Sequence, residues 1–412
     1  GNTDRGDFAF TTTTYFNETL LMEKIRVLHP ITRLIIGGAQ ENTMLTADYL
    51  NHRPEYAGQY DVSIVSGPQT GPEGSLIEEV QARGIPLTIM PELLREVSPA
   101  NDLRALMKLT KMMRNGRFHI VHSHSSKAGV LGRVAAKLAG IPLIVHTVHG
   151  WSFHEQMSPR KLSFYVALEK IGDWCGDATI VVTAKDRDKG VAQGIKNAAH
   201  YTLIRSGIEL DRFGHPQISP AHMRQQLGIP QDALVVGSVT RLSAQKAPLD
   251  LVTAIIHVLR QQPDTWFVIV GDGELRPDVE RALQTAGIAN QVVLTGLRRD
   301  IPELMAAFDV FVLSSLWEGL PRVLPQAMAT GLPIVCTQAD GSAEAVIEGE
   351  NGFLVTKGQP EELANKVVML LKNEGLRQQM GENGRIQAPL FSAELMVTDI
   401  DALYRRLLPS RV

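Results

Sequence analysis

The stretch SSLWEGLPRVLPQAMATGLPIV, residues 314–335, combines the end of a strand, a loop, a helix and the start of another strand. Glu318 stands in the turn EGLP, where a carboxylate has no place in a core. The helix expected at 322–330 begins there, and a helix N-terminus offers free amides and partial positive charge. Gln326 lies about one turn inside this helix and can face the same side. We interpret the segment as a site for an anionic or hydroxyl-rich ligand.

The same alternation of short apolar runs and amphipathic stretches extends in both directions from this stretch. Strands are expected at 25–29, 61–65, 86–90, 119–123, 143–147, 178–182 and 201–205, and then at 233–239, 267–271, 292–296, 310–314, 333–337 and 352–355. A segment with proline and glycine, 206–230, separates the two sets. This pattern is typical of parallel sheets covered by helices, so we expect an α/β fold with two doubly wound, Rossmann-like domains facing across a cleft. Ligands of such sheets bind outside the carboxyl ends of the strands.

Length and composition fit this interpretation. A chain of 412 residues suits two domains, and a hydrophobic content of 44% indicates a globular protein. A formal net charge of −3 gives no reason to expect a nucleic-acid partner. Cys175 and Cys336 lie far apart without metal-ligand spacing, which fits a reducing compartment. With no signal peptide or apolar run of about 20 residues, the expected location is cytoplasmic. Residues 1–21 lack a core pattern and are treated as an N-terminal extension.

Three loops of the second half carry candidate phosphate-binding residues. Arg241 and Lys246 follow a strand at the start of a helix, where two cations suit a diphosphate. Gly271 and Gly296 each follow another strand and permit close approach of the backbone to a ligand. Taken singly, these features are better explained by a solvated basic pair and by ordinary tight turns.

In the first half, Gly37 and Gly38 join the first strand to the first helix and can approach a phosphate or a sugar. Histidines gather at two strand ends, namely His122, His124, His146 and His149. Zinc would be a tempting ligand, but no known ligand spacing is present, so we expect no metal. The D-x-D at 186–188 follows a strand at a helix start, where helix capping is the better explanation.

Together these motifs resemble the E-x7-E signature of the retaining GT-B glycosyltransferases of family four. The resemblance covers nearly all of residues 24–408 and is greatest to bacterial capsule, exopolysaccharide and lipid-linked glycan assembly enzymes. Its supporting marks are GGAQ (37–40), HTVHG (146–150), RSGIELDRF (205–213), R-x4-K (241–246), GDGEL (271–275), TGL (295–297) and NGFLV (351–355).

The resemblance implies a role for each matching residue. Those at the reaction centre would be His149, Arg241, Lys246 and Glu318. Those that bind the donor would be Gly37, Gly38, Gly271, Gly296, Leu297, Gly319, Leu320, Pro321 and Gln326. The acceptor side would include Glu73, His124 and Lys127. Within this set, Arg241 and Lys246 would grip the donor diphosphate without a metal, and Glu318 would hold hydroxyls of the donor sugar.

The sequence departs from the family pattern at three positions. Gln326 replaces the second glutamate, which holds the ribose hydroxyls in the family. An amide still accepts and donates hydrogen bonds, so losing the charge-assisted bond would cost roughly 1 kcal/mol. Ala247 replaces the usual glycine after the lysine, and Ser206 replaces an asparagine. We expect both of these to be tolerated.

The implied activity is transfer of a hexosyl or N-acetylhexosaminyl group from a nucleotide diphosphate sugar, with retention at the anomeric carbon and no required cofactor. UDP is the expected carrier by family frequency, with GDP and ADP open. The acceptor would be a glycan or a polyprenyl-diphosphate-linked glycan in cell-surface polysaccharide synthesis. Two alternatives are a GT-B nucleotide-sugar 2-epimerase and a non-catalytic nucleotide-sugar-binding subunit.

The expected organisation assigns an acceptor-side domain to 22–210, a donor domain to 211–390 and a helix that crosses back onto the first domain to 391–412. Residues 103–118 form a basic helix with an apolar stripe of Leu103, Leu106, Met107 and Met113. One interpretation places this stripe on the sheet and the other face in water. The other is contact with an anionic membrane surface, which would place the protein peripherally at the inner face of the membrane.

Overall fold

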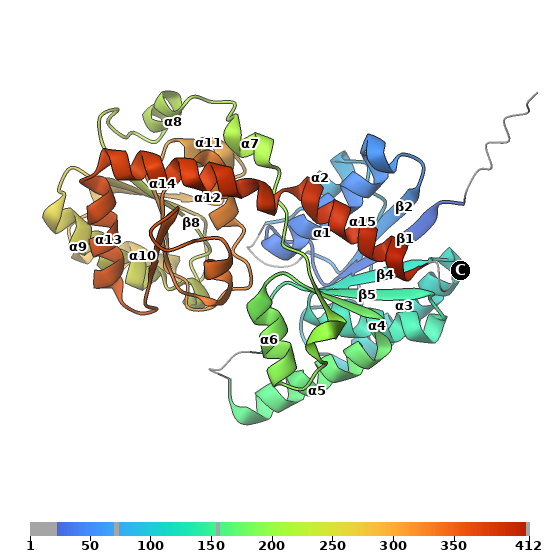
Figure 1. Cartoon of the computed structure of the whole chain (residues 1–412). Coiled ribbons are helices and arrows are strands. Elements are labelled where there is room, and N and C mark those ends of the chain that lie inside the picture. Colours follow the sequence, from blue (N-terminus) through green and yellow to red (C-terminus); the bar gives the residue numbers. More distant parts are fainter. Residues whose placement is uncertain (1–22, 70–73, 154–156, 409–412) are drawn as a thin grey trace, which may run out of the picture.

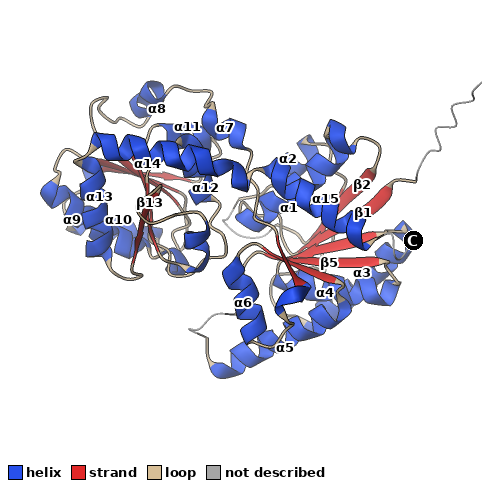
Figure 2. Cartoon of the chain, viewed as in Figure 1, coloured by secondary structure: helices blue, strands red, loops and turns tan. Residues whose placement is uncertain are grey.

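The protein is described by a computed structural model that covers residues 23–69, 74–153 and 157–408. The chain forms two lobes, and the strands of each lobe fan out between covering helices (Figures 1 and 2). Every neighbouring pair of named strands within the two sheets is parallel. The α/β fold with two Rossmann-like sheets is therefore confirmed. The N-terminal extension predicted for 1–21 lies outside the described residues.

The first lobe holds a seven-stranded sheet in the order β3-β2-β1-β4-β5-β6-β7. Its strands are β1 (Ile25–Ile31), β2 (Tyr60–Ser66), β3 (Leu87–Ile89), β4 (Ile120–His124), β5 (Leu143–Val148), β6 (Ala178–Val181) and β7 (Tyr201–Leu203). Its helices are α1 (Gly38–His52), α2 (Ile77–Ala82), α3 (Pro99–Gly116), α4 (Ser126–Ala139), α5 (Pro159–Cys175) and α6 (Ala184–Ala192). The central strands β4 and β5 are buried along their whole length, as expected for a sheet covered on both faces.

The second lobe holds a six-stranded sheet in the order β10-β9-β8-β11-β12-β13. Its strands are β8 (Val235–Val239), β9 (Trp266–Val270), β10 (Val292–Gly296), β11 (Val310–Leu313), β12 (Ile334–Thr337) and β13 (Gly352–Val355). The helices before and around it are α7 (Leu210–Gly214), α8 (Pro220–Gln226), α9 (Pro248–Gln261), α10 (Arg276–Thr285), α11 (Ile301–Ala306), α12 (Val323–Thr330), α13 (Pro360–Leu371) and α14 (Glu374–Gln387). In both sheets the strand order reverses between the first and fourth strands, which is where ligands of this fold bind.

The last helix, α15 (Ala393–Leu407), joins the core of the first lobe although it follows α14 of the second (Figure 1). Ser392 caps it, because its hydroxyl accepts a hydrogen bond from the amide of Leu395. Met396, Ile400 and Tyr404 are buried against α1 and the first sheet. The chain therefore passes between the lobes twice, once after β7 and once before α15.

The apolar stripe predicted for α3 is confirmed for Met113 and for the partly buried Leu106, but is wrong for Leu103 and Met107. The helix buries Ala105, Leu109 and Met113 against the sheet, whereas Leu103 and Met107 are each 57% exposed. The first buried residue of the helix is Ala105 and not Leu103, so the buried stripe begins two positions later than expected. Across the described residues, no helix combines the length and the apolar character that crossing a membrane requires.

Candidate active site

The loops after β8 and β11 meet at the point where the strand order of the second sheet reverses. Lys246 lies at the end of a short 3-10 helix in the first of these loops, and Glu318 lies in the second. The two side chains form an ion pair in which the lysine is 20% and the glutamate 7% exposed. Two predicted site residues that are 72 positions apart in sequence are thus brought together.

Hydrogen bonds fix the two loops against each other around this pair. The amide of Leu316 donates to the carbonyl of Gln245 (2.8 Å), and Gln245 Nε2 donates to the carbonyl of Trp317 (2.8 Å). Ser314 Oγ donates to the carbonyl of Lys246 (2.8 Å). Gln245 and Ser314 are therefore positioning residues that the sequence reasoning missed. The signature contains both residues, but nothing in the sequence indicates that they bond to each other's loop.

Arg241 lies on the same loop, five residues before Lys246, and is partly exposed. Within the described ranges its guanidinium has no hydrogen-bond or ion-pair partner, which leaves its donors available to a ligand. Ala247, the residue after the lysine, has φ 44° and ψ 56°. This is the left-handed region that favours glycine, which gives the family's usual glycine here a physical reason.

Two glycines allow loops to approach so closely that no side chain would fit. Gly271 has φ 128°, and a Cβ there would lie 1.9 Å from the carbonyl oxygen of Thr240. Its amide donates to the carbonyl of Gly296 (2.9 Å). A Cβ on Gly319 would lie 2.4 Å from the carbonyl oxygen of His149. The turn after Glu318 therefore lies against the loop after β5, so residues from both lobes contribute to one site.

Next to Gly319, Leu320 and Pro321 are buried, whereas Leu297 after β10 is 46% exposed. Gln326 lies on α12 and lines a cavity of about 100 Å³ between the lobes. Neither Lys246 nor Glu318 lines this cavity. The cavity that Gln326 lines is therefore not lined by the ion pair.

Arg322 joins the lobes and was missed by the sequence reasoning. Its guanidinium forms an ion pair with Glu41 on α1 and donates to the carbonyl of Gly207 (2.8 Å). A Cβ on Gly38 would lie 3.2 Å from its Cδ, so the Gly37–Gly38 loop of the first lobe faces this arginine. A cation directly before a helix is electrostatically unfavourable unless an acid compensates for its charge. The position of Arg322 in the sequence, directly before the expected helix, could therefore have indicated an acidic partner.

The predicted acceptor-side residues have different surroundings. Lys127, in the first turn of α4, forms an ion pair with Asp102 of α3 (2.5 Å) and donates to the carbonyl of Glu96. His124 ends β4 and is 1% exposed. Glu73 lies outside the described residues.

His149 follows β5 and is partly exposed, and its Nε2 lies 3.0 Å from Nδ1 of His124. Burial, together with the charge of Arg322, lowers the pKa of His149 to about 3, so its imidazole is neutral at physiological pH. Burial also holds the pKa of His124 well below its usual value. A neutral imidazole carries one donor and one acceptor nitrogen, so His149 can position an oxygen but carries no charge.

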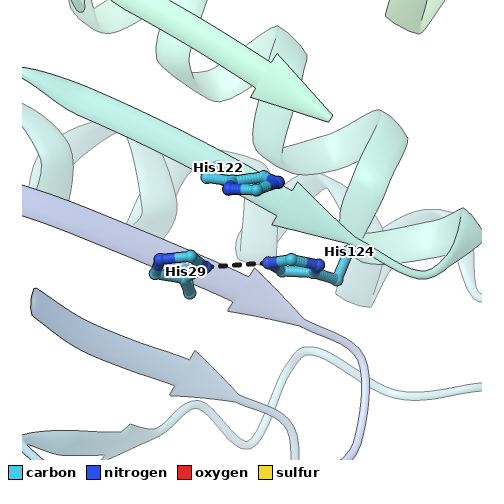
Figure 3. A group of neighbouring side chains, drawn as sticks. All are labelled: His29, His122 and His124. Carbon is cyan, nitrogen blue, oxygen red and sulfur yellow. Dashed lines mark hydrogen bonds between the residues drawn. The ribbon is translucent and has the colours of Figure 1, made fainter. Parts of the chain in front are cut away.

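A buried group of three imidazoles lies behind His149 and includes His29, which the sequence reasoning did not single out (Figure 3). One nitrogen from each of His29, His122 and His124 lies within 4.8 Å of the others. These are the residues in the described ranges whose spacing could hold a metal. However, both nitrogens of His122 are hydrogen-bonded, to Tyr404 Oη and Thr147 Oγ1 (2.6 Å each).

The D-x-D segment lies in the first turn of α6, as expected, but the residue that caps the helix is Thr183. Thr183 precedes α6, and its hydroxyl accepts a hydrogen bond from the amide of Asp186 (3.0 Å) and donates to the carboxylate of the same residue (2.7 Å). Burial raises the pKa of Asp186 to about 6. The lysines on either side of Asp186, Lys185 and Lys189, instead bind Asp340 of the second lobe.

Comparison with known proteins adds an independent line of evidence. Residues 37–207 match the model of the glycosyl transferase 4-like domain, and residues 221–387 match that of glycosyl transferases group 1. A UDP-Gal:alpha-D-GlcNAc-diphosphoundecaprenol alpha-1,3-galactosyltransferase of Escherichia coli is 32% identical over 360 residues, which are 86% of this chain and 89% of that protein. The capsular polysaccharide biosynthesis glycosyltransferase CapM of Staphylococcus aureus is 24% identical over 84% of this chain and 90% of its own. The fold is similar to that of HepE of Anabaena, solved with UDP and glucose, with a TM-score of 0.79, 23% identity and coverage of 93% of this chain and 100% of that one.

Proposed function

Since the chain belongs to the GT-B glycosyltransferases of family four, we propose that it transfers a hexosyl or N-acetylhexosaminyl group from a UDP-sugar to a glycan or polyprenyl-diphosphate-linked acceptor, with retention. That the chain is a glycosyltransferase follows from the family itself. The galactosyltransferase of Escherichia coli supports the finer assignment, because its name specifies a UDP-linked donor and a diphosphate-lipid acceptor. Neither the epimerase nor the non-catalytic alternative is favoured by these relatives.

The ion pair of Lys246 and Glu318, opposite His149, is the observation that carries this proposal. A donor diphosphate would draw the Lys246 amine to itself and release the Glu318 carboxylate to accept hydrogen bonds from sugar hydroxyls. Arg241, with its donors available, would be the second cation on the diphosphate. In this arrangement the two cations stabilise the charge that develops on the leaving group, which is a large contribution to catalysis in general.

The second lobe, 211–390, would then hold the donor, and the first lobe, 22–210, would present the acceptor. The Gly37–Gly38 loop would close over the diphosphate, and Lys127 and Glu73 would border the acceptor. His124 was expected there as well, but it is buried and both of its ring nitrogens bond to other histidines, so it would act through His149. Gly271, Gly296, Leu297 and the Gly319–Pro321 turn would approach the nucleotide and the sugar, and Gln326 the ribose. No metal is required in this proposal, because two side-chain cations take over the neutralisation of the diphosphate.

Calorimetric titration with UDP, GDP and ADP, with and without EDTA, tests the donor assignment. We expect micromolar UDP binding that EDTA does not change and that Lys246→Ala weakens at least tenfold. Lys372→Ala removes an exposed lysine at the end of α13 and is the matched control. Equal affinity of wild type and Lys246→Ala for UDP, or a requirement for a divalent cation, would contradict the proposal.

We also propose that the first lobe contacts an anionic membrane surface, where a lipid-linked acceptor would reside. On α3, Leu103 and Met107 are exposed beside Arg104 and Lys111. On α5, the exposed apolar residues are Phe164, Ile171 and Trp174, and the exposed cations are Arg160, Lys161 and Lys170. Both acids of α5 are buried, Glu169 with Arg133 and Asp173 beside His200. An apolar and basic helix surface without exposed acids is the composition that anionic lipid favours.

Co-sedimentation with vesicles measures this contact. We expect binding to vesicles that contain phosphatidylglycerol, little binding to pure phosphatidylcholine, and weaker binding after Ile171→Ser combined with Trp174→Ser. Ile386→Ser, which removes an exposed isoleucine of the second lobe, is the matched control. Equal binding of both variants would refute a role for α5.

A further inference from the structure

Three histidines form a continuous hydrogen-bonded chain from the interior of the first sheet to the reaction centre. His29 Nδ1 lies 2.8 Å from His124 Nε2, and His124 Nδ1 lies 3.0 Å from His149 Nε2 (Figure 3 shows the first of these bonds). His29 and His124 are 0% and 1% exposed, on the adjacent strands β1 and β4. This hydrogen-bonded chain uses both ring nitrogens of His124, its middle residue. The direction of one hydrogen bond therefore fixes the direction of the other.

All three imidazoles are neutral at physiological pH. Burial lowers the pKa of His29 to about 3, and His124 and His149 are shifted in the same direction. A neutral imidazole has one N–H and one lone pair. The chain can therefore run in only two directions: either every histidine donates toward His149, or every histidine donates toward His29.

The inner end of the chain distinguishes these two directions. His29 Nε2 is buried and has no hydrogen-bond partner among the described residues. If the chain donated toward His29, this atom would be an N–H group without an acceptor, which folded proteins rarely tolerate. If the chain donates toward His149, the same atom is a lone pair. Donation toward His149 therefore leaves no buried donor of the three histidines unpaired.

We propose that His29 and His124 are positioning residues that hold His149 as the tautomer with its proton on Nδ1, so that His149 donates a hydrogen bond into the reaction centre. Within the described part of the chain, Nδ1 of His149 has no protein partner and is available to a substrate oxygen. His149 would then orient an oxygen of the substrates and not act as the base that deprotonates the acceptor. The inference rests on the proposed placement of His149 at the reaction centre.

A metal is the competing explanation for this cluster. Zinc bound to three imidazoles needs three free lone pairs at about 2.0–2.1 Å from the ion. Here His29 Nδ1 and His124 Nε2 share a hydrogen bond, and both nitrogens of His122 bond to hydroxyl groups. Binding of an ion would break at least two of these bonds. The hydrogen-bonded arrangement therefore accounts for the cluster as it stands.

The test is 15N NMR of protein labelled in its histidine rings, with His149→Gln to assign the signals. We expect a protonated Nδ1 and an unprotonated Nε2 for His149 in the wild type. In His29→Leu, which removes the first donor, we expect a mixture of tautomers and a five- to tenfold lower kcat/KM. The amide of His29→Asn can reach the position of Nδ1, so this variant should restore the single tautomer and most of the activity.

A protonated Nε2 on His149 in the wild type would overturn the proposal, even if His29→Leu failed to fold. Stoichiometric zinc in the purified protein, measured by mass spectrometry, would overturn it in favour of a metal site. An unchanged His149 tautomer in a folded and active His29→Leu would overturn it as well. Absence of any sugar transfer by the wild type would instead count against the proposed function, because the tautomer remains measurable without activity.

Discussion

Lys246 and Glu318 neutralise each other in a site that is only slightly exposed, so a donor must compete with a carboxylate for the lysine. This competition favours a ligand with more than one negative charge, because a single charge would only replace the existing partner. A diphosphate meets this condition, and the available guanidinium of Arg241 adds a second cation. Gln326 lines the cavity between the lobes, makes no part of the ion pair and contributes no charge.

These different surroundings predict unequal effects of two substitutions. Lys246→Ala should lower kcat by about 10²–10³-fold, because it removes charge stabilisation at the leaving group. Gln326→Ala should lower kcat/KM by less than about tenfold, because it removes one neutral hydrogen-bonding group. Steady-state kinetics with a UDP-sugar measure both, with Lys372→Ala as the control. Equal losses would count against the separate roles given to the two residues.

At the residue scale, the sequence identified the positions of the signature but not the residues that hold them in place. Glu318, Lys246 and His149 could be singled out because each belongs to a short local motif. Gln245 and His29 could not, because their importance comes from contacts with other loops and strands. Such contacts depend on the packing of distant segments, which a sequence pattern does not specify.

Among the elements, the short 3-10 helix that carries Lys246 ends in a strained residue. Ala247 has a left-handed backbone conformation, which costs an alanine roughly 1–2 kcal/mol. Ser314 bonds to the carbonyls of Lys246 and Ala247 and thereby holds this conformation. The strain is thus located directly beside Lys246, the lysine proposed to bind the donor diphosphate.

We therefore predict that Ala247→Gly increases the free energy of unfolding by about 0.5–1 kcal/mol, measured by urea denaturation. The control is Ala286→Gly at the end of α10, where the alanine has φ −79° and no strain to relieve. That variant should be neutral or less stable than the wild type. If Ala247→Gly lowered the free energy of unfolding, the left-handed conformation of Ala247 would not be destabilising the wild-type protein.

Helices and strands could be predicted from the sequence where one pattern of apolar residues dominated the segment. The buried parallel strands appear as continuous apolar runs, and every expected strand has a counterpart in the structure. The stripe of α3 was misassigned because alanine contributes little to an apolar pattern, yet Ala105 packs fully against the sheet. The start of α6 was predictable because capping is a local interaction, although the capping residue is Thr183 and not part of the D-x-D.

Across the whole molecule, the lobes are joined by side-chain contacts as well as by α15. Arg322 binds Glu41, and Arg205 binds Glu344 (3.1 Å). Tyr404 of α15 reaches His122 within the first sheet (2.6 Å). The sequence indicated two sheets and a final helix, but these partners lie far apart in the chain and had no readable signal apart from the position of Arg322.

The buried histidines of the first lobe make its stability sensitive to acid. Burial lowers the pKa of His29, His122, His124, His146 and His149 below the unfolded value of about 6.5. Below that pH the unfolded chain binds more protons than the folded one, so stability falls as the pH falls. The contribution of these groups is complete above pH 6.5 and declines toward the folded pKa, which is about 3 for His29 and His149.

We predict that the free energy of unfolding falls between pH 7.5 and 5.5 by up to about 1.4 kcal/mol for each such imidazole. Urea denaturation at several pH values measures this slope. His29→Asn removes one titrating group and should make the slope shallower. His222→Asn replaces an exposed histidine on α8 and is the control. Stability that stays constant or rises as the pH falls would refute this account of the histidines.

The central claim is transfer of a sugar with retention at a site built around Lys246 and Glu318. Its most direct test is the anomeric configuration of the product formed from α-linked UDP-hexoses and UDP-N-acetylhexosamines with a synthetic polyprenyl-diphosphate-linked sugar, determined by proton NMR. We expect an α-linked product from the wild type and at least about 10²-fold slower formation by Lys246→Ala. A β-linked product, or an α-linked product formed equally fast by both proteins, would contradict the account.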